Sequence, residues 1–212
     1  CGFPKDNYYY YKARWSTEPV LHVFPHWNWP GREGQPIEVW CHTNLDRVEL
    51  FVNGKPVGAS AQTVPPNGHV AWQVPYVPGV LEARASRGSR VVLTARRETT
   101  GAPAAVVLDA DRHRLTADGT DVAVIAARIV DAQGRTVPIV GDRVTFATNG
   151  PASLIGVGNG DPSSHESDKD NMRSAFNGLC CAIVQAGTEQ GAAHVTAAAE
   201  GLTSGTVELT VG

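Results

Sequence analysis

Charge, methionine and long apolar runs are scarce in this sequence. Asp, Glu, Lys and Arg make up 18% of the 212 residues, the formal net charge is −3, and there is one methionine. Basic residues gather no further than pairs such as Arg96-Arg97, so the chain lacks the positive field that attracts a polyanion. No apolar stretch reaches the roughly 18 residues that a membrane-spanning helix needs. We therefore expect no nucleic-acid partner and no membrane partner.

Cysteine is also sparse, and its spacing is irregular. The four cysteines are Cys1, Cys41, Cys180 and Cys181, a spacing that matches neither a zinc ribbon nor a regular disulfide framework. Because neighbouring strand residues face opposite sides of a sheet, Cys180 and Cys181 do not readily pair with each other. We expect buried free thiols, no metal site and no cofactor.

Turn residues and short valine-rich runs are abundant instead. The chain holds 22 glycines and 14 prolines, and such runs at short intervals are typical of an all-β protein. Ile37, Val39 and Cys41 alternate with outward-facing positions. The run 48–52 leads into Asn53-Gly54, the strongest short hairpin signal, and residues 55–60 are the predicted return strand. Further runs at 70–74, 80–85 and 91–96 complete a first β-sandwich.

The strand pattern restarts after a linker-like segment, residues 99–103. About seven further runs between 103 and 212 predict a second, immunoglobulin-like sandwich. The predicted fold is thus all-β, with two consecutive immunoglobulin-like or fibronectin-like β-sandwiches, at 18–100 and 103–212. Residues 156–171 form a polar loop unusually long for a compact domain, which makes the loop a candidate for function or disorder.

The opening segment is the most aromatic part of the chain. Nine of the fifteen aromatic residues lie in the first thirty positions. Residues 2–14 are the one predicted helix, with Asp6 near its positive end and Lys12 and Arg14 near its negative end. So much apolar surface predicts docking on a body outside this sequence. We expect a fragment whose residues 1–17 finish an element that began upstream.

Catalytic residues are not apparent. Hydrolysis of a glycoside needs two carboxylates about 5–10 Å apart on rigid elements, and no such pair stands out. Glu38 and Glu49 fall at outward strand positions, while Glu18 and Glu33 fall in loops. We therefore assign no catalytic residue.

The long loop contains three patterns that resemble sites. Residues 156–160 resemble a phosphate-binding loop, but Asp161-Pro162 follows where a helix should begin. Ser164-His165-Glu166 has the residue types of a catalytic triad, yet adjacent residues do not assemble one. Three aspartates with Asn171 offer oxygens to calcium without a known spacing. We interpret all three as features of a solvated turn.

Tryptophans are the remaining residues with binding chemistry. Sugar rings stack on exposed aromatic faces, so His26, Trp27 and Trp29 are candidate substrate-binding residues, with Trp40 and Trp72 as further exposed rings. The alternative is that residues 25–30 clamp a domain junction, and this reading is preferred.

Several long motifs resemble the C-terminal accessory domains of bacterial β-galactosidases of glycoside hydrolase family two. They extend over nearly the whole chain. They are Gly2-Phe-Pro-Lys-Asp6 with Tyr8, Tyr10-Tyr11-Lys12 and Trp15; Leu21–Trp29; Gly31–Gln35; Val48–Lys55; Gly156–Pro162; Ser164–Glu166; and Arg173–Gly178.

The resemblance implies a division of labour within a larger protein. In that family an upstream (β/α)8 barrel carries an acid/base Glu and a nucleophile Glu, and hydrolysis retains the anomeric configuration. Neither Glu lies in the matching part of this sequence. The resemblance implies that the chain braces this barrel, which is its partner. The carbohydrate substrate of the parent enzyme would be a β-galactoside, or a glucuronide. A homodimer is a further expectation. The alternatives are an independent carbohydrate-binding module using exposed tryptophans and an adhesin-like stalk.

Overall fold

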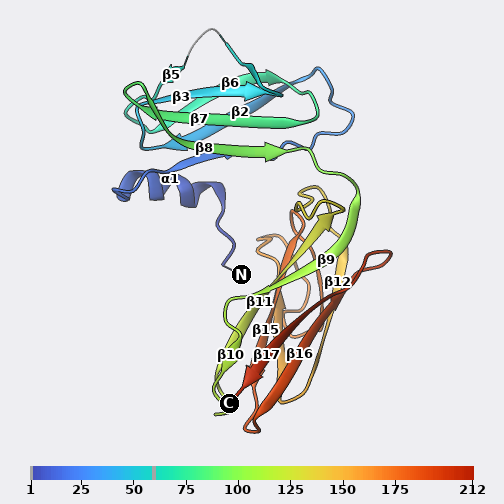
Figure 1. The fold of residues 1–212 in the computed structure, drawn as a ribbon. Coiled ribbons are helices and arrows are strands. Elements are labelled where there is room, and N and C mark those ends of the chain that lie inside the picture. Colours follow the sequence, from blue (N-terminus) through green and yellow to red (C-terminus); the bar gives the residue numbers. More distant parts are fainter. Residues whose placement is uncertain (1, 59–60) are drawn as a thin grey trace. The chain divides into compact units, whose positions relative to one another are not determined.

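The computed structural model describes residues 2–58 and 61–212, which form two compact units (Figure 1). The units contain residues 3–99 and 100–212. Each is a β-sandwich with its own hydrophobic core, and one short helix precedes the first. The predicted all-β fold with two sandwiches is confirmed.

Within its described residues, the first unit contains one helix and eight strands. They are α1 (Asp6–Trp15), β1 (Leu21–Phe24), β2 (Pro36–Thr43), β3 (Arg47–Val52), β4 (Lys55–Pro56), β5 (Gln62–Thr63), β6 (His69–Pro75), β7 (Val80–Arg87) and β8 (Arg90–Glu98). One sheet has the order β1-β2-β6, and the other has the order β4-β3-β7-β8 with β5 paired to β3.

Strand β2 shows how sequence alternation builds this sandwich. Ile37, Val39 and Cys41 point into the core, while Glu38 is exposed. His42 is buried as well, although alternation places it on the outer face. The reason is α1, which lies along this sheet and contacts β1 and β2 (Figure 1).

The β3–β4 hairpin has the predicted two-residue turn. Val52 pairs with Lys55, and the two residues between them have φ values of +50° for Asn53 and +77° for Gly54. Two consecutive positive φ angles are the type I′ geometry, whose twist matches that of the flanking strands. The Asn53 side chain also accepts a hydrogen bond from the Val80 amide at 2.8 Å, which ties the turn to β7.

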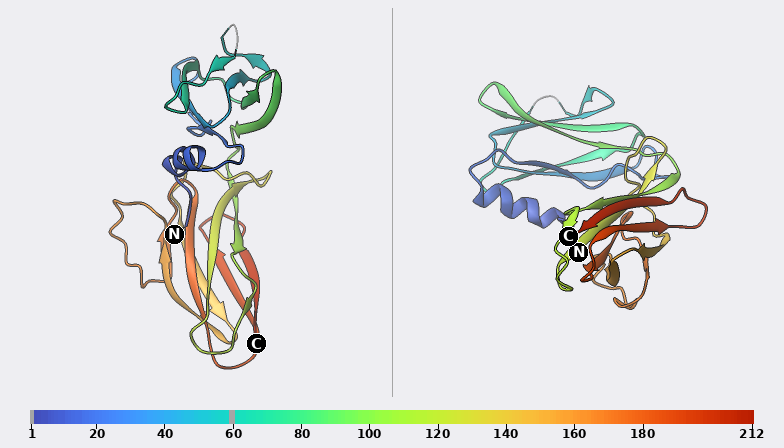
Figure 2. Two further views of the ribbon diagram at one scale, coloured as in Figure 1. Left: turned by 90° about the vertical axis from the view of Figure 1, so that its left-hand side faces the viewer. Right: turned by 60° about the horizontal axis from the view of Figure 1, so that its bottom comes forward.

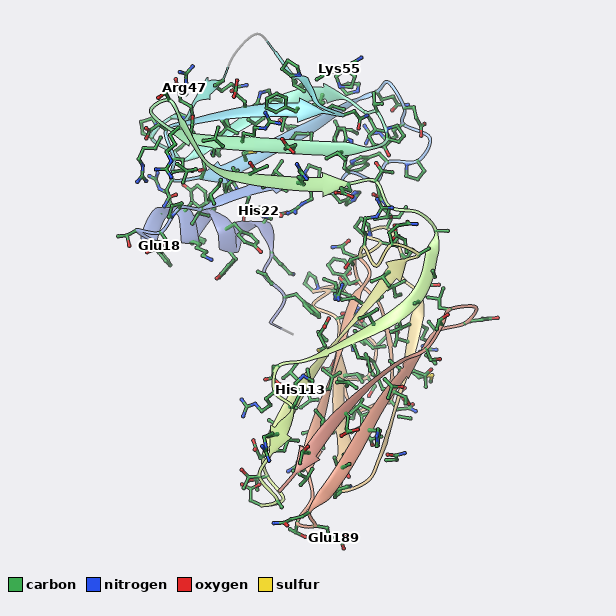
Figure 3. All side chains as sticks on the ribbon, viewed as in Figure 1. Glu18, His22, Arg47, Lys55, His113 and Glu189 are labelled. Atoms are coloured by element: carbon green, nitrogen blue, oxygen red, sulfur yellow. The ribbon has the colours of Figure 1, made fainter. Side chains whose placement is uncertain are left out.

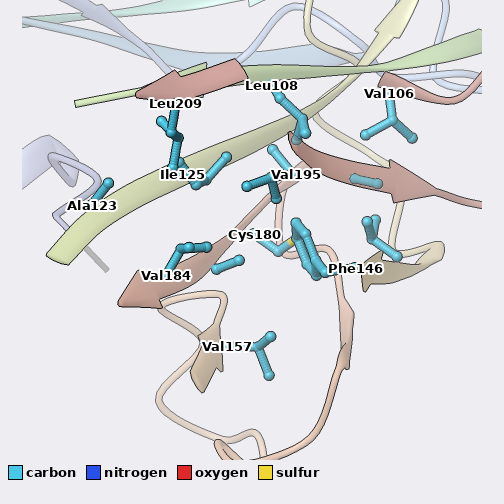
Figure 4. Packing of buried hydrophobic residues seen from close by; sticks show 14 of the residues in the cluster. Val106, Leu108, Ala123, Ile125, Phe146, Val157, Cys180, Val184, Val195 and Leu209 are labelled. Atoms are coloured by element: carbon cyan, nitrogen blue, oxygen red, sulfur yellow. The ribbon is translucent and has the colours of Figure 1, made fainter. Parts of the chain in front are cut away.

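The second unit contains nine strands. They are β9 (Pro103–Ala110), β10 (Arg114–Leu115), β11 (Val122–Asp131), β12 (Arg143–Asn149), β13 (Ala152–Gly158), β14 (Met172–Ser174), β15 (Leu179–Ala186), β16 (Gly191–Ala198) and β17 (Gly205–Val211). The sheets have the orders β10-β17-β16-β12-β14 and β13-β15-β11-β9. Residues of both sheets interdigitate in the core, where Ile125, Phe146 and Leu209 are fully buried (Figure 4).

Some boundaries differ from the sequence-based expectations. The helix covers Asp6–Trp15 rather than residues 2–14. Strand β4 ends at Pro56, and the predicted return strand as far as Ser60 runs into positions 59–60, which lie outside the described residues. The short strands β10 and β14 were not predicted, because two or three residues carry no readable alternation.

Candidate functional site

Helix α1 has aromatic side chains on two sides. Its inner side packs on the sheet through Ala13, Tyr9 and Tyr10. Tyr8, Tyr11 and Trp15 lie on the outer side at helical spacing and are 52%, 51% and 80% exposed. We call these three residues the outer stripe. A ten-residue helix is marginal by itself, and one with apolar side chains on both sides is suited to lie between two packed bodies.

The predicted sugar contacts take different positions. Trp27 is fully buried, donates its indole N–H to the Val77 carbonyl at 2.9 Å and packs edge-on against Tyr76. Its ring therefore has no free face for a ligand. Trp29 is half-buried and stacks on His26 at 4.6 Å, with the Arg32 guanidinium 5.2 Å from its ring.

The other tryptophans do not form an exposed array either. Trp72 is buried in the core. Trp40 is half-buried and stacks on His69 with ring centroids 4.7 Å apart, and Phe24 lies 6.3 Å away on the neighbouring strand. The expectation that Trp27 and Trp72 are exposed is thus wrong, because both face inward between the sheets. Sugar binding by His26 and Trp29 stays a prediction.

Buried carboxylates are paired with arginines. Glu82 accepts hydrogen bonds from Nε of Arg84 and Nε of Arg96, both at 2.6 Å. Burial alone would raise the pKa of Glu82, but these two cations hold it below its ordinary value. Asp131 is bound by Arg135 at 2.6 Å in the same way. Each of these buried carboxylates is thus neutralised by a neighbouring arginine, which is a structural role.

The long polar loop of the second sandwich is folded around Arg173. This buried side chain donates to Asp168 at 2.8 Å and to the Glu166 carbonyl at 3.1 Å. Glu166 in turn accepts from the Ser174 hydroxyl at 2.8 Å, and buried Asn159 donates to the Ser174 carbonyl at 2.9 Å. The loop projects from the side of the domain (Figure 2, left). The contacts of Arg173 hold it in this turn.

The described residues hold neither a cluster of metal ligands nor a membrane-spanning helix. Within residues 2–58 and 61–212, no group of three or more His, Cys, Asp or Glu side chains could hold a metal ion. No helix in the described part of the chain is long and apolar enough to cross a membrane. Cys41, Cys180 and Cys181 are buried free thiols, as expected. Burial raises the pKa of the Cys180 thiol to about 12, so that it is inert at neutral pH.

Known proteins contain domains similar to both units of this chain. Residues 106–208 match the family described as glycoside hydrolase family 2 C-terminal domain 5, and residues 34–93 match a domain of unknown function, DUF4982. Beta-galactosidase BoGH2A of Bacteroides ovatus is 41% identical over 210 residues, which are 99% of this chain and 24% of that protein. The chain belongs to the C-terminal domains of glycoside hydrolase family 2.

Other relatives show the same relation of part to whole. A putative beta-glucuronidase of Formosa agariphila is 34% identical over 204 residues, or 94% of this chain and 20% of that protein. A crystal structure of a family 2 member from Bacteroides cellulosilyticus matches with a TM-score of 0.92 at 31% identity, covering 98% of this chain and 30% of that one. The chain thus corresponds to a small part of larger family 2 proteins, and the resemblance inferred from its motifs is confirmed.

Sequence reasoning missed a polar cluster under α1. His22 is buried between α1 and the edge of the sheet (Figure 3) and lies 2.7 Å from Asp6 and 3.3 Å from Arg97. The available signal was the pairing of an acidic first helical turn with histidines in the nearest strands, a weak pattern without the fold.

Proposed function

We propose that this chain is the non-catalytic C-terminal region of a β-galactosidase. Residues 1–17 end an upstream catalytic barrel, and the sandwiches at 18–100 and 103–212 brace it. The main support is 41% identity to BoGH2A along nearly the whole chain, which covers only 24% of that protein. The outer stripe of α1 supplies an apolar surface of the kind that such packing buries.

The substrate proposed for the parent enzyme is a β-galactoside. Identity is 41% to a protein named as a β-galactosidase, against 34% to one named as a putative β-glucuronidase. The difference favours galactosides and makes β-glucuronides the second choice. The residues that would decide between them belong to the barrel in this proposal.

An activity assay tests the non-catalytic role. We expect the 212-residue chain to leave a chromogenic β-galactoside and a chromogenic β-glucuronide unhydrolysed, because the buried Glu82 and Asp131 and the half-buried Glu166 are tied to arginines. Turnover that disappears in Glu82→Gln or Glu166→Gln would contradict the proposal. Turnover unaffected by either change would indicate a contaminating glycosidase, which a second purification removes.

A further inference from the structure

Three histidines stand opposite one another on the outer face of the first sheet. His22 of β1 pairs with His42 of β2, and His42 pairs with His69 of β6. Directly paired residues on adjacent strands project from the same face of a sheet. The ring centroids of His42 and His69 are 6.1 Å apart. We call these three residues the histidine row.

Helix α1 covers two members of the row. Tyr9 stacks on His22 with centroids 3.8 Å apart and planes at 6°, and Tyr10 meets His42 edge-on at 5.3 Å. His22 and His42 are buried, whereas His69 is half-buried. The histidines therefore form part of the surface on which the helix rests.

The hydrogen bonds of His22 define the roles of its two ring nitrogens. Nη2 of Arg97 lies 3.3 Å from Nδ1 of His22, and because arginine only donates, Nδ1 accepts and carries no proton. The ring proton is then on Nε2, which donates to Asp6 Oδ1 at 2.7 Å. The His22 ring thus joins Arg97 of β8 to Asp6 of α1.

The surroundings of His42 disfavour a positive charge on its ring. Its Nδ1 is buried and has no hydrogen-bond partner among the residues that the structure describes. The rings of Tyr10 and Phe24 and the two other histidines surround it. A proton there would create a buried cation without an acceptor.

Few charged groups face His42 from the elements packed around it. Asp6 on α1 is the acidic group, and it is already engaged by His22. Arg97 of β8 also reaches His22, and Arg14 of α1 donates to the Pro66 carbonyl in the loop before β6. A positive charge on His42 would be repelled by both arginines.

We propose that His42, the middle member of the histidine row, is a proton-sensitive latch for α1: the helix packs on neutral His42, and uptake of a proton by His42 releases the helix from the sheet. The proposal follows from the position of the row under α1 and from the lack of an acceptor for Nδ1. It concerns this chain alone and does not require the proposed glycosidase role.

Linkage gives the direction of the effect. Burial, followed by the neighbouring His22 and His69, lowers the pKa of His42 from its ordinary 6.5 to about 4 while α1 is in place. The state with α1 released therefore binds more protons between about pH 6.5 and pH 4. The packing of α1 on the sheet weakens as the pH falls through this window. If release restores the ordinary pKa, the docking equilibrium changes on the order of 20-fold between pH 7 and pH 5.

Release would also change the outer stripe. Tyr8, Tyr11 and Trp15 are carried by the same helix, so an unlatched α1 no longer presents them in one orientation. Under the proposed function, which this consequence rests on, acidification would loosen the accessory sandwich from its barrel.

Hydrogen exchange of the 212-residue chain tests the latch. The hydrogen-bonded amides of α1 are compared at pH 7 and pH 5 after correction for intrinsic exchange, with β7 as the internal reference for the same sandwich. We expect α1 protection to fall on the order of 20-fold while β7 protection holds. In His42→Phe, which keeps a ring at this site, the pH-dependent loss of α1 protection should disappear. In His69→Phe, the matched control on the next strand, this loss should remain.

Other outcomes would overturn the latch. These are unchanged α1 protection in the unmodified chain, an equal loss in α1 and β7, or a loss that persists in His42→Phe. His42→Gln, which is smaller and also does not titrate, provides the same comparison if His42→Phe does not fold. None of these outcomes bears on whether the chain hydrolyses a galactoside, so the proposed function is tested separately.

Discussion

At the scale of single residues, Asp131 illustrates how a buried charge is used to fix a turn. Its carboxylate accepts from Arg135 at 2.6 Å and from the amides of Gly101, Gln133 and Arg135 at 2.8–3.0 Å. Burial alone would raise the pKa of Asp131, but these donors hold it well below its ordinary value. Asp131→Ala should destabilise the second sandwich by about 3–5 kcal/mol, because it leaves Arg135 and three amides without their acceptor. Urea unfolding measures the change.

Asp109 provides the matched control for that variant. It pairs with Arg128 at 2.8 Å, but the Asp109 side chain is 59% exposed whereas that of Asp131 is fully buried, so Asp109→Ala should cost less than about 1 kcal/mol. The contribution of Asp131 is present above the ordinary carboxylate pKa near 4 and is lost as the pH falls further, because its folded pKa is depressed. Equal losses in the two variants would contradict the structural role given to Asp131.

At the scale of elements, the β3–β4 hairpin depends on the backbone of Gly54. Its φ of +77° is strained for any L side chain, although a Cβ there would meet no atom within 4 Å. Gly54→Val should therefore destabilise the first sandwich by about 1–2 kcal/mol through backbone strain. Lys55→Val places the same side chain at the next, exposed position of β4 and should be close to neutral. An unchanged denaturation midpoint for Gly54→Val would show that the turn does not need this geometry.

The elements also show what sequence could and could not predict. Asn53-Gly54 and the alternation along β2 and β11 are local signals, and the structure follows them. The burial of His42 and Trp27 was not predictable in this way, because it depends on α1 and on segments 50 residues apart in the chain, such as Trp27 with Val77. The Arg173 network was likewise invisible, since it forms only after the long loop folds back on β14.

At the scale of the whole molecule, the outer stripe of α1 is the surface feature that predicts an interface. Isolated exposed apolar residues are ordinary, and Val91 of β8 is one, at 49% exposure. The outer stripe differs because two of its rings adjoin each other, with Tyr11 and Trp15 centroids 5.0 Å apart, and Tyr8 lies on the same helix face. Adjacent rings on one helix face form a patch, and patches mark interfaces more often than single residues do.

This patch leads to a prediction about the free chain. We expect the 212-residue chain to bind a hydrophobic dye or to self-associate, and Trp15→Ser to weaken that association at least tenfold, since one buried aromatic ring contributes about 1.5–3 kcal/mol. Val91→Ser removes a single exposed side chain of β8 and should leave association unchanged. Sedimentation and dye titration at neutral pH measure both variants.

The same chain also distinguishes docking from sugar binding. If residues 2–30 form a docking segment, titration with galactose, lactose or a galactan should produce no saturable change in tryptophan fluorescence. A saturable change that is lost in Trp29→Ala would instead make the carbohydrate-binding module the better interpretation, because Trp29 is the half-buried ring beside His26 and Arg32. Trp27→Ala cannot decide the matter, since Trp27 is a core residue whose loss would destabilise the first sandwich whether or not a sugar binds.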